Sequence, residues 1–254
     1  MRLRKILILL LAAQLCLTGL AETGYITDYQ EPYRSQYHFS SATSWIGDPD
    51  GYVYYDGTYH LFWWGKATSK DLVHFDQQTI GDTFAITGEN ILNDFFTGSA
   101  VIDKDNTAGF GENSMVAICT IPTSPQKQAI AYSLDDTFNS LHYYDGNPVL
   151  EHETASAFRD PTVFRDEENN HWTMVIALPD DHAVAFYSSP DLKEWTFLSE
   201  FGRIGAQSGA WECPDLFRMT ADDGAEKWVL IISVGPNLEQ YFVGEFDGLK
   251  KWFG

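Results

Sequence analysis

Three carboxylates stand close to prolines in three short segments of similar composition. The segments are WIGDPDG at residues 45–51, FRDP at residues 158–161 and WECPD at residues 211–215. Asp48 and Asp160 directly precede a proline, and Glu212 lies two residues before one. Carboxyl groups can transfer protons or attack as nucleophiles. Brought to one point, these three acids would support both kinds of chemistry.

The three acids occupy equivalent positions in a repeated unit. Each is followed by a short strand-like run, a turn and a second run rich in aromatic or β-branched residues. The clearest case follows Asp48, where residues 52–55, the Asp56-Gly57 turn and residues 59–63 form a hairpin signature. A β-propeller places equivalent positions of successive blades around one axis, so the pattern predicts that the acids converge.

A second recurring element supports the repeat. Ser-x-Asp occurs at residues 69–71, 133–135 and 189–191, and a weaker unit runs from residues 96–101 to 115–119. Aromatic residues make up 15% of the chain, and no long stretch repeats apolar residues at helical spacing. The sequence therefore predicts an all-β fold with about four propeller blades, the last of them incomplete.

The N-terminus has the pattern of a secretory signal peptide. Residues 1–5 are basic, residues 6–17 are apolar, and residues 19–21 are small enough for a cleavage site. The apolar run is shorter than the roughly 20 residues that span a bilayer. We expect a signal peptide at residues 1–21 and no membrane insertion of the mature chain, which would be secreted or periplasmic.

The expected organisation of the mature chain is simple. A lead-in occupies residues 22–44, and an incomplete propeller domain that carries the acids occupies residues 45–254.

The formal net charge of −20 argues against nucleic acid or an anionic membrane as a partner. The excess acidity is spread along the chain, which favours a role in solubility. A neutral sugar is compatible with such a surface.

Two cysteines remain after the expected cleavage, Cys119 and Cys213, and we expect both to be free thiols. No HExxH, paired CxxC, GxGxxG or P-loop pattern occurs, so no metal or cofactor is predicted. Residues 48–51 begin like a calcium loop, but the later loop positions and the closing Glu are missing.

Three acids at one point suit the cleavage of a glycosidic bond. One acid protonates the departing oxygen, and another attacks the anomeric carbon or activates water. The third can orient the sugar and stabilise the cationic transition state.

The same segments carry a family resemblance. WIGDPDG, FRDP and WECPD, together with residues 59–75 and FTGSAV at residues 96–101, resemble in order the signatures of glycoside hydrolase family 32. This family contains invertases, inulinases and levanases. The resemblance runs from about Trp45 to the C-terminus. It implies a five-bladed β-propeller, usually followed by a β-sandwich, so we expect that the fifth blade and the sandwich lie outside this chain and that the sequence is a fragment.

The resemblance also implies roles for individual residues. Asp48 would be the nucleophile of a retaining mechanism with a covalent fructosyl intermediate, Glu212 the general acid/base and Asp160 the transition-state stabiliser. Arg159 would neutralise and position the carboxylates, and Glu212 would be the protonated acid, with a raised pKa. The further residues expected to bind substrate are Trp45, Trp64, Ser99 and Trp211.

Two departures from the family pattern concern the sugar. The family's Asn before the nucleophile is Gly47 here, and the Asn after the proline is Asp50. In addition, Phe62 leads directly into Trp63-Trp64-Gly65, where the family has a longer loop with a glutamine. These changes leave the acids in place but alter the innermost subsite.

The expected substrate is a carbohydrate with β-fructofuranosidic bonds, either sucrose or a fructan such as inulin or levan. Two alternatives stay open at this point: an inverting furanosidase of the arabinofuranosidase or xylosidase type, and a non-catalytic fructan-binding protein. No pattern in the sequence predicts an oligomeric state.

Overall fold

The computed structural model describes residues 32–35, 37–42, 45–79, 84–89, 94–248 and 252–253. Regular structure within these ranges is β-strand apart from one 3-10 turn, η1 (Pro179–Asp181). No helix in the same ranges is long and apolar enough to cross a membrane. The predicted signal peptide and most of the predicted lead-in lie outside the described residues.

The strands form four sheets, each built from consecutive stretches of the chain, and these sheets are the predicted blades. Blade 1 contains β1 (Gly51–Tyr55), β2 (Thr58–Phe62), β3 (Lys66–Ser69) and β4 (Phe75–Gln77). Blade 3 contains β11 (Arg159–Asp166), β12 (His171–Leu178), β13 (Ala183–Ser189) and β14 (Thr196–Gly202). Blade 4 contains β15 (Trp211–Thr220), β16 (Glu226–Val234), β17 (Leu238–Phe246) and β18 (Trp252–Phe253). In all three the strands pair in antiparallel fashion in chain order.

Blade 2 has two additional short strands. Its central strands are β6 (Phe96–Asp103), β7 (Ser114–Ile121), β8 (Lys127–Ser133) and β9 (Ser140–Tyr143). The additional strands are β5 (Ala85–Thr87), which runs parallel to β9, and β10 (Leu150–Glu151), which pairs with β8. The prediction of four blades is confirmed, but the last blade is not incomplete as expected, because its sheet has four strands.

The local sequence explains the turns that repeat. Tyr55 pairs with Thr58 across a two-residue turn, in which Asp56 and Gly57 have φ values of 42° and 73°. Positive φ at both positions is the geometry of a type I′ turn, which Asp-Gly favours.

The Ser-x-Asp elements also form a common turn, between the third and fourth strands of a blade. The Oδ1 atoms of Asp71 and Asp191 each accept hydrogen bonds of 2.8–2.9 Å from the N–H groups two and three residues ahead. The intervening Leu72 and Leu192 have φ values of 65° and 64°. An aspartate can make this local turn because its short side chain reaches the backbone ahead of it.

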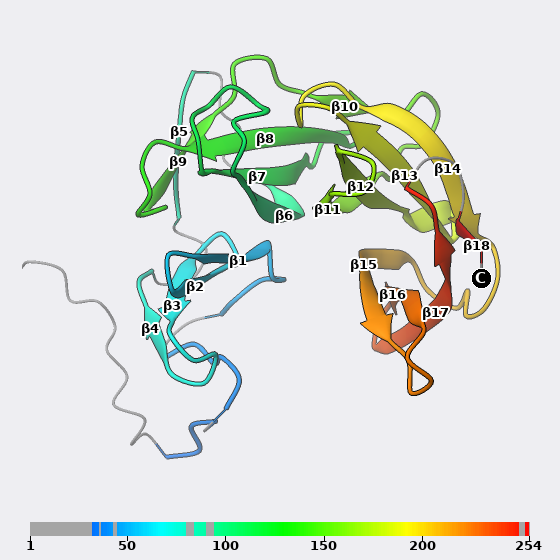
Figure 1. Cartoon of the computed structure of the whole chain (residues 1–254), viewed down its shortest axis with the longest axis horizontal. Helices are drawn as coiled ribbons and strands as arrows, with labels where there is room; N and C mark the ends of the chain where they lie inside the picture. The colour runs from blue at the N-terminus through cyan, green and yellow to red at the C-terminus, as the bar shows by residue number, and fades with distance from the viewer. Residues whose placement is uncertain are drawn as a thin grey trace, which may run out of the picture.

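The blades lie in an arc around a common centre, with their first strands innermost (Figure 1). β1 lies beside β6, β6 beside β11, and β11 beside β15. Apolar side chains fill the space between neighbouring sheets. For example, Ile118 of blade 2 and Met174 of blade 3, both fully buried, belong to one cluster. Similar clusters join blade 1 to blade 2 and blade 3 to blade 4.

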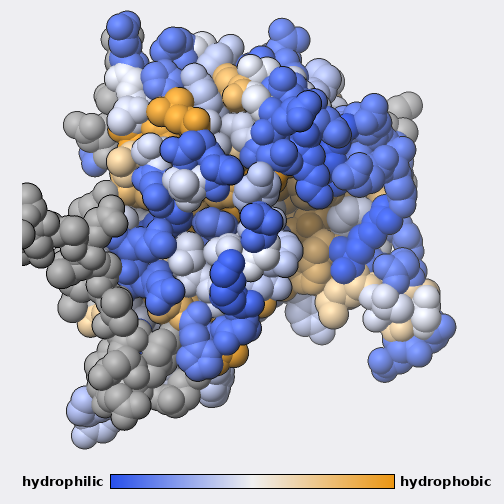
Figure 2. Space-filling model, turned by 60° about the vertical axis from the view of Figure 1, so that its left-hand side comes forward, coloured by the Kyte–Doolittle hydropathy of each residue, from blue (hydrophilic) through white to orange (hydrophobic). Residues whose placement is uncertain are grey.

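The sheets at the two ends of the arc each have an apolar face that no other described sheet covers. Tyr52 and Tyr54 of β1 are 49% and 60% exposed, and Tyr241 and Val243 of β17 are 69% and 50% exposed. The side of the molecule shown in Figure 2 is mostly hydrophilic, with smaller apolar areas.

The close approach of β6 and β7 depends on Gly98. A Cβ atom at this position would lie 1.8 Å from the backbone oxygen of Ile118. We expect Gly98→Ala to lower the free energy of unfolding by about 1–3 kcal/mol, because the two strands must separate. Urea unfolding measures the loss. Gly47→Ala is the control, because its Cβ would make an ordinary 3.4 Å contact with the Trp45 ring. Equal stability of the two variants would contradict the prediction.

Candidate active site

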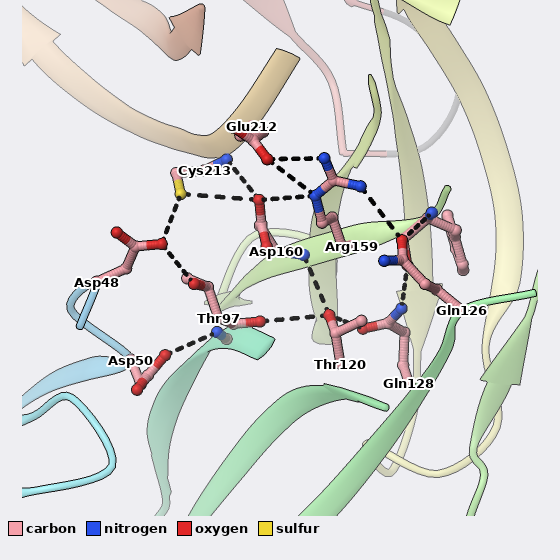
Figure 3. A network of polar contacts seen from close by, with 12 residues as sticks. Asp48, Asp50, Thr97, Thr120, Gln126, Gln128, Arg159, Asp160, Glu212 and Cys213 are labelled. Atoms are coloured by element: carbon pink, nitrogen blue, oxygen red, sulfur yellow. Dashed lines mark hydrogen bonds and ion pairs between the residues drawn. The ribbon is translucent and has the colours of Figure 1, made fainter. Parts of the chain in front are cut away.

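The three predicted acids come together at the end of the molecule where the inner strands begin (Figure 3). Asp160 and Glu212 are the second residues of β11 and β15, and Asp48 lies just before β1. Thr97, the second residue of β6, completes the set from blade 2. Equivalent positions in the four blades therefore meet, as the repeat predicts.

Irregular backbone turns two of the acids toward the centre. Strand pairing shifts register between Arg159 and Thr162 and again between Glu212 and Asp215, and a proline lies inside each irregular stretch. Proline has no N–H group for a strand pair, and a β-bulge redirects the neighbouring side chains. The Asp-Pro and Cys-Pro pairs thus explain locally why the strands are interrupted here.

The bulges hold two residues in the left-handed region, Asp160 with a φ of 61° and Cys213 with a φ of 47°. The Cys213 N–H group donates a 3.1 Å hydrogen bond to Asp160 Oδ2. The Asp160 N–H group donates a 3.1 Å bond to Thr120 Oγ1 in blade 2. The two strained positions therefore stabilise each other across blades 3 and 4.

Asp48 is exposed and is bound from the neighbouring blade. Its Oδ2 atom accepts a 2.7 Å hydrogen bond from Thr97 Oγ1 and lies 3.8 Å from Cys213 Sγ. A hydrogen bond to one carboxylate oxygen fixes the rotation of the group while the carboxylate remains accessible to a ligand.

Arg159 connects Glu212 to Asp160. Its Nε and Nη2 atoms donate to Glu212 Oε1 at 3.0 and 2.7 Å, and its Nε atom lies 3.9 Å from Asp160 Oδ2. The Arg159 side chain is only 18% exposed, so solvent screens these contacts weakly. This agrees with the expectation that Arg159 neutralises the carboxylates.

Burial raises the pKa of Asp160 to about 6; the Cys213 N–H bond and Arg159 oppose the increase, whereas Glu212 and Asp48 add to it. Asp160 is only 5% exposed, which is why desolvation dominates there.

A pocket of about 450 Å³ opens beside the acids. Asp48, Arg159 and Glu212 contribute to its wall, and so do the predicted Trp45 and Trp64. The other residues that line the pocket are Gly47, Asp50, Phe95, Phe96 and Thr97. Sequence reasoning missed Phe95 and Phe96, although they directly precede the TGSAV part of the family-like segment.

Two residues predicted to bind substrate lie outside this pocket. Trp211 is fully buried, and its Nε1 atom donates a 2.7 Å bond to the Ala206 carbonyl. It faces away from Glu212 because successive residues of a strand point to opposite sides. Ser99 Oγ accepts a 3.1 Å bond from the Val163 N–H group, and thus joins blade 2 to blade 3. Full burial contradicts the prediction that Trp211 binds substrate. The predicted binding role of Ser99 stays a prediction.

The direct connection after Phe62 forms part of the pocket wall. The chain turns between β2 and β3 through Trp63, Trp64 and Gly65, with Trp64 at a φ of 62°. The Trp64 ring packs against Phe95 at a centroid distance of 5.6 Å. The turn therefore places an aromatic ring in the pocket wall.

Both cysteines in the described residues are free thiols, as expected. Cys119 is buried in an apolar cluster of blade 2. Cys213 lies among the acids, with its Sγ atom 3.7 Å from Asp160 Oδ2. Burial is the main cause that raises the pKa of the Cys213 thiol, and the three carboxylates add to it. Among the described residues no group of three or more His, Cys, Asp or Glu side chains could hold a metal ion.

Comparison with known proteins defines the family. The model of the glycosyl hydrolases family 32 N-terminal domain matches residues 38–254. Four sheets around a centre with acids at the start of the inner strands is the architecture of a propeller hydrolase of this kind, and the chain belongs to glycosyl hydrolase family 32.

Curated relatives of the chain include an exo-inulinase and a levanase. The extracellular exo-inulinase of Aspergillus niger is 37% identical over 285 residues, covering 94% of this chain and 53% of the relative. The levanase of Bacillus subtilis is 42% identical over 246 residues, covering 87% of this chain and 35% of the relative. The chain spans about half the length, or less, of these curated relatives.

Solved structures agree with the fold. The exo-inulinase from Aspergillus awamori superposes with a TM-score of 0.78 at 35% identity, over 89% of this chain and 52% of the other. A fructofuranosidase from Schwanniomyces occidentalis, in complex with fructosylnystose, superposes with a TM-score of 0.76 at 33% identity, over 90% and 49% of the two chains.

The raised pKa of Asp160 has a consequence for stability. A carboxyl group with a higher pKa in the folded state than in the unfolded state favours folding at low pH, and this contribution is lost as pH rises through the folded pKa. For Asp160 the pH window runs from the ordinary aspartate pKa of 3.8 to its raised pKa of about 6. We expect Asp160→Asn, measured by urea unfolding, to gain up to about 3 kcal/mol relative to the parent between pH 4 and pH 7. A difference between variant and parent that is independent of pH would contradict this.

Proposed function

We propose that this chain carries the catalytic acids of a secreted enzyme that hydrolyses β-fructofuranosidic bonds in sucrose or a fructan. The observation that carries the proposal is the convergence of Asp48, Asp160 and Glu212, each from a different blade, beside one pocket. The names of the relatives, exo-inulinase and levanase, support fructan as the substrate class. The extracellular label of the exo-inulinase and the expected signal peptide both support secretion.

Asp48 is suited to be the nucleophile. It is exposed in the pocket, and Thr97 fixes its orientation through a 2.7 Å hydrogen bond to Oδ2. An oxygen of Asp48 would attack the anomeric carbon of the fructosyl unit as the bond to the leaving oxygen breaks. The product of this step is a fructosyl ester on Asp48.

Glu212 is suited to transfer protons on the opposite side of the reaction. It would give a proton to the leaving oxygen, and in the second step its carboxylate would take a proton from the water that hydrolyses the ester. Arg159 Nη2 donates a 2.7 Å hydrogen bond to Glu212 Oε1 and so holds the carboxyl group in position for this transfer.

Asp160 is suited to stabilise the transition state. It is buried and lies in contact with Arg159 and the Cys213 N–H group. From this position it would bind fructose hydroxyls and oppose the positive charge that develops on the ring. Its role needs no proton transfer.

The pocket wall supports a sugar substrate with an altered innermost subsite. Gly47 provides no side-chain amide. A Cβ atom added at position 47 would contact the Trp45 ring at 3.4 Å, so this ring lies beside Gly47. Together with Trp64 and Phe95, this favours recognition of the sugar through its apolar faces.

Exchange of the Asp48 carboxylate tests the function directly. We expect Asp48→Asn to lower sugar release from sucrose, inulin and levan at least about 1,000-fold, because an amide cannot form the ester. Product quantification by ion chromatography measures it. The matched control is Asp56→Asn, an identical change in the β1–β2 turn, where asparagine fits the positive φ.

The outcomes separate the alternatives. Equal activity of Asp48→Asn and Asp56→Asn would rule out Asp48 as the nucleophile. A folded chain that binds fructan but releases no sugar would support the non-catalytic fructan-binding alternative. Release of an inverted product would support the inverting furanosidase.

A further inference from the structure

Two glutamines of blade 2 hold the chain just ahead of Arg159 and Asp160. The Phe158 N–H group donates a 2.8 Å hydrogen bond to Gln126 Oε1. The Phe158 carbonyl accepts a 2.7 Å bond from Gln128 Nε2. Gln126 directly precedes β8 and Gln128 is its second residue, so the two are two positions apart and both side chains reach Phe158. Both polar groups of one peptide residue are thus bound by the neighbouring blade.

Hydrogen bonds also link the same glutamines to Arg159 and, through Thr120, to Asp160 (Figure 3). Gln126 Oε1 also accepts from Arg159 Nη1 at 3.4 Å, on the nitrogen that does not contact Glu212. Gln128 Oε1 accepts a 2.9 Å bond from Thr120 Oγ1, and Thr120 Oγ1 accepts the 3.1 Å bond from the Asp160 N–H group. One glutamine therefore reaches the guanidinium group, and the other reaches the Asp160 backbone.

These hydrogen bonds lie where the regular pairing of β11 with β12 is interrupted. The pairing of β11 with β12 shifts register between Arg159 and Thr162, and Pro161 has no N–H group. Asp160 has a φ of 61°, a conformation that is strained for a non-glycine residue and persists only where surrounding contacts impose it. The bonds from blade 2 provide such contacts on the side away from β12.

The network lies in the interior of the molecule. Gln128 and Thr120 are fully buried and form a cross-strand pair between β8 and β7. Each of the bonds described pairs a donor with an acceptor. A satisfied buried network of this kind fixes one geometry, because any other arrangement leaves polar groups without partners.

We propose that Gln126 and Gln128 are positioning residues for the reaction, which set the orientation of the Arg159 guanidinium and the Asp160 carboxylate from the neighbouring blade. The proposal rests on the function proposed above. Blade 2 contributes no acid. Through Gln126 and Gln128, as well as through Thr97, it would nevertheless contribute to the catalytic geometry.

The two glutamines differ in a way that kinetics can detect. Gln126 acts only as an acceptor in these bonds, whereas Gln128 both donates and accepts. Gln126→Met and Gln128→Met should each lower kcat about 10- to 100-fold with little change in KM, because a small misplacement of catalytic groups has effects of this size. Gln126→Glu keeps the acceptor oxygens and should retain kcat within about fivefold of the parent. Gln128→Glu loses the donor to Phe158 and should not recover.

Lys127 provides the matched control between the two glutamines. Its side chain forms a 2.8 Å surface ion pair with Glu151 and contacts neither Phe158 nor Arg159 in any bond described here. Lys127→Met should keep kcat within about twofold, since surface pairs contribute little. Thermal unfolding of each variant identifies those that remain folded at the assay temperature. If folded Gln126→Met and Gln128→Met match Lys127→Met in kcat, the proposal is wrong.

A crystal structure of Gln128→Met tests the geometry without activity. We expect Asp160 to leave its φ of 61° and its Oδ2 atom to move away from the Cys213 N–H group, which now lies 3.1 Å from it. An unchanged Asp160 in that structure would overturn the proposal even if the parent chain cleaved no fructoside. Inactivity of the parent on every fructoside would instead count against the proposed function, and the structure alone would then decide the positioning role.

Discussion

Three carboxyl groups of like charge converge around one guanidinium group, and the rest of the site depends on how their repulsion is balanced. Arg159 contacts Glu212 directly and lies beside Asp160, whereas Asp48 is bound by Thr97. Each acid therefore has a different stabilising partner. These differences in environment support the proposed roles: an exposed carboxylate for attack, an ion-paired one for proton transfer and a buried one for binding.

The backbone that positions the acids departs from regular strand geometry, and a proline recurs at each departure. A regular strand points successive side chains to opposite faces, so an acid at the start of an inner strand needs an interruption to reach the centre. Pro161 and Pro214 provide it by removing an N–H group from the strand ladder. Left-handed residues at Asp160 and Cys213 follow from the same interruption, and contacts between blades hold them.

The sequence predicted the parts of the structure that local chemistry determines. The Asp56-Gly57 turn, the recurrence of the Ser-x-Asp element in successive blades and the equivalent positions of the three acids follow from residue types and spacing, and all are found. Side-chain direction was harder to predict: Trp211 follows the strand alternation into the core, and Ser99 bonds to blade 3. The resemblance implied that Arg159 would neutralise the carboxylates, and its ion pair with Glu212 agrees with that expectation. The role of Gln126 and Gln128 was invisible in the sequence, because their partners lie 30 or more residues away along the chain.

The central claim is that Asp48 forms a covalent bond to the sugar while Glu212 moves the proton. Mass spectrometry of the chain, acid-quenched during turnover of a fructoside and digested, tests it most directly. The account predicts a peptide that contains Asp48 and is heavier by one fructosyl unit. The same added mass on a peptide that contains Asp160 or Glu212, or release of sugar with no labelled peptide, would contradict it.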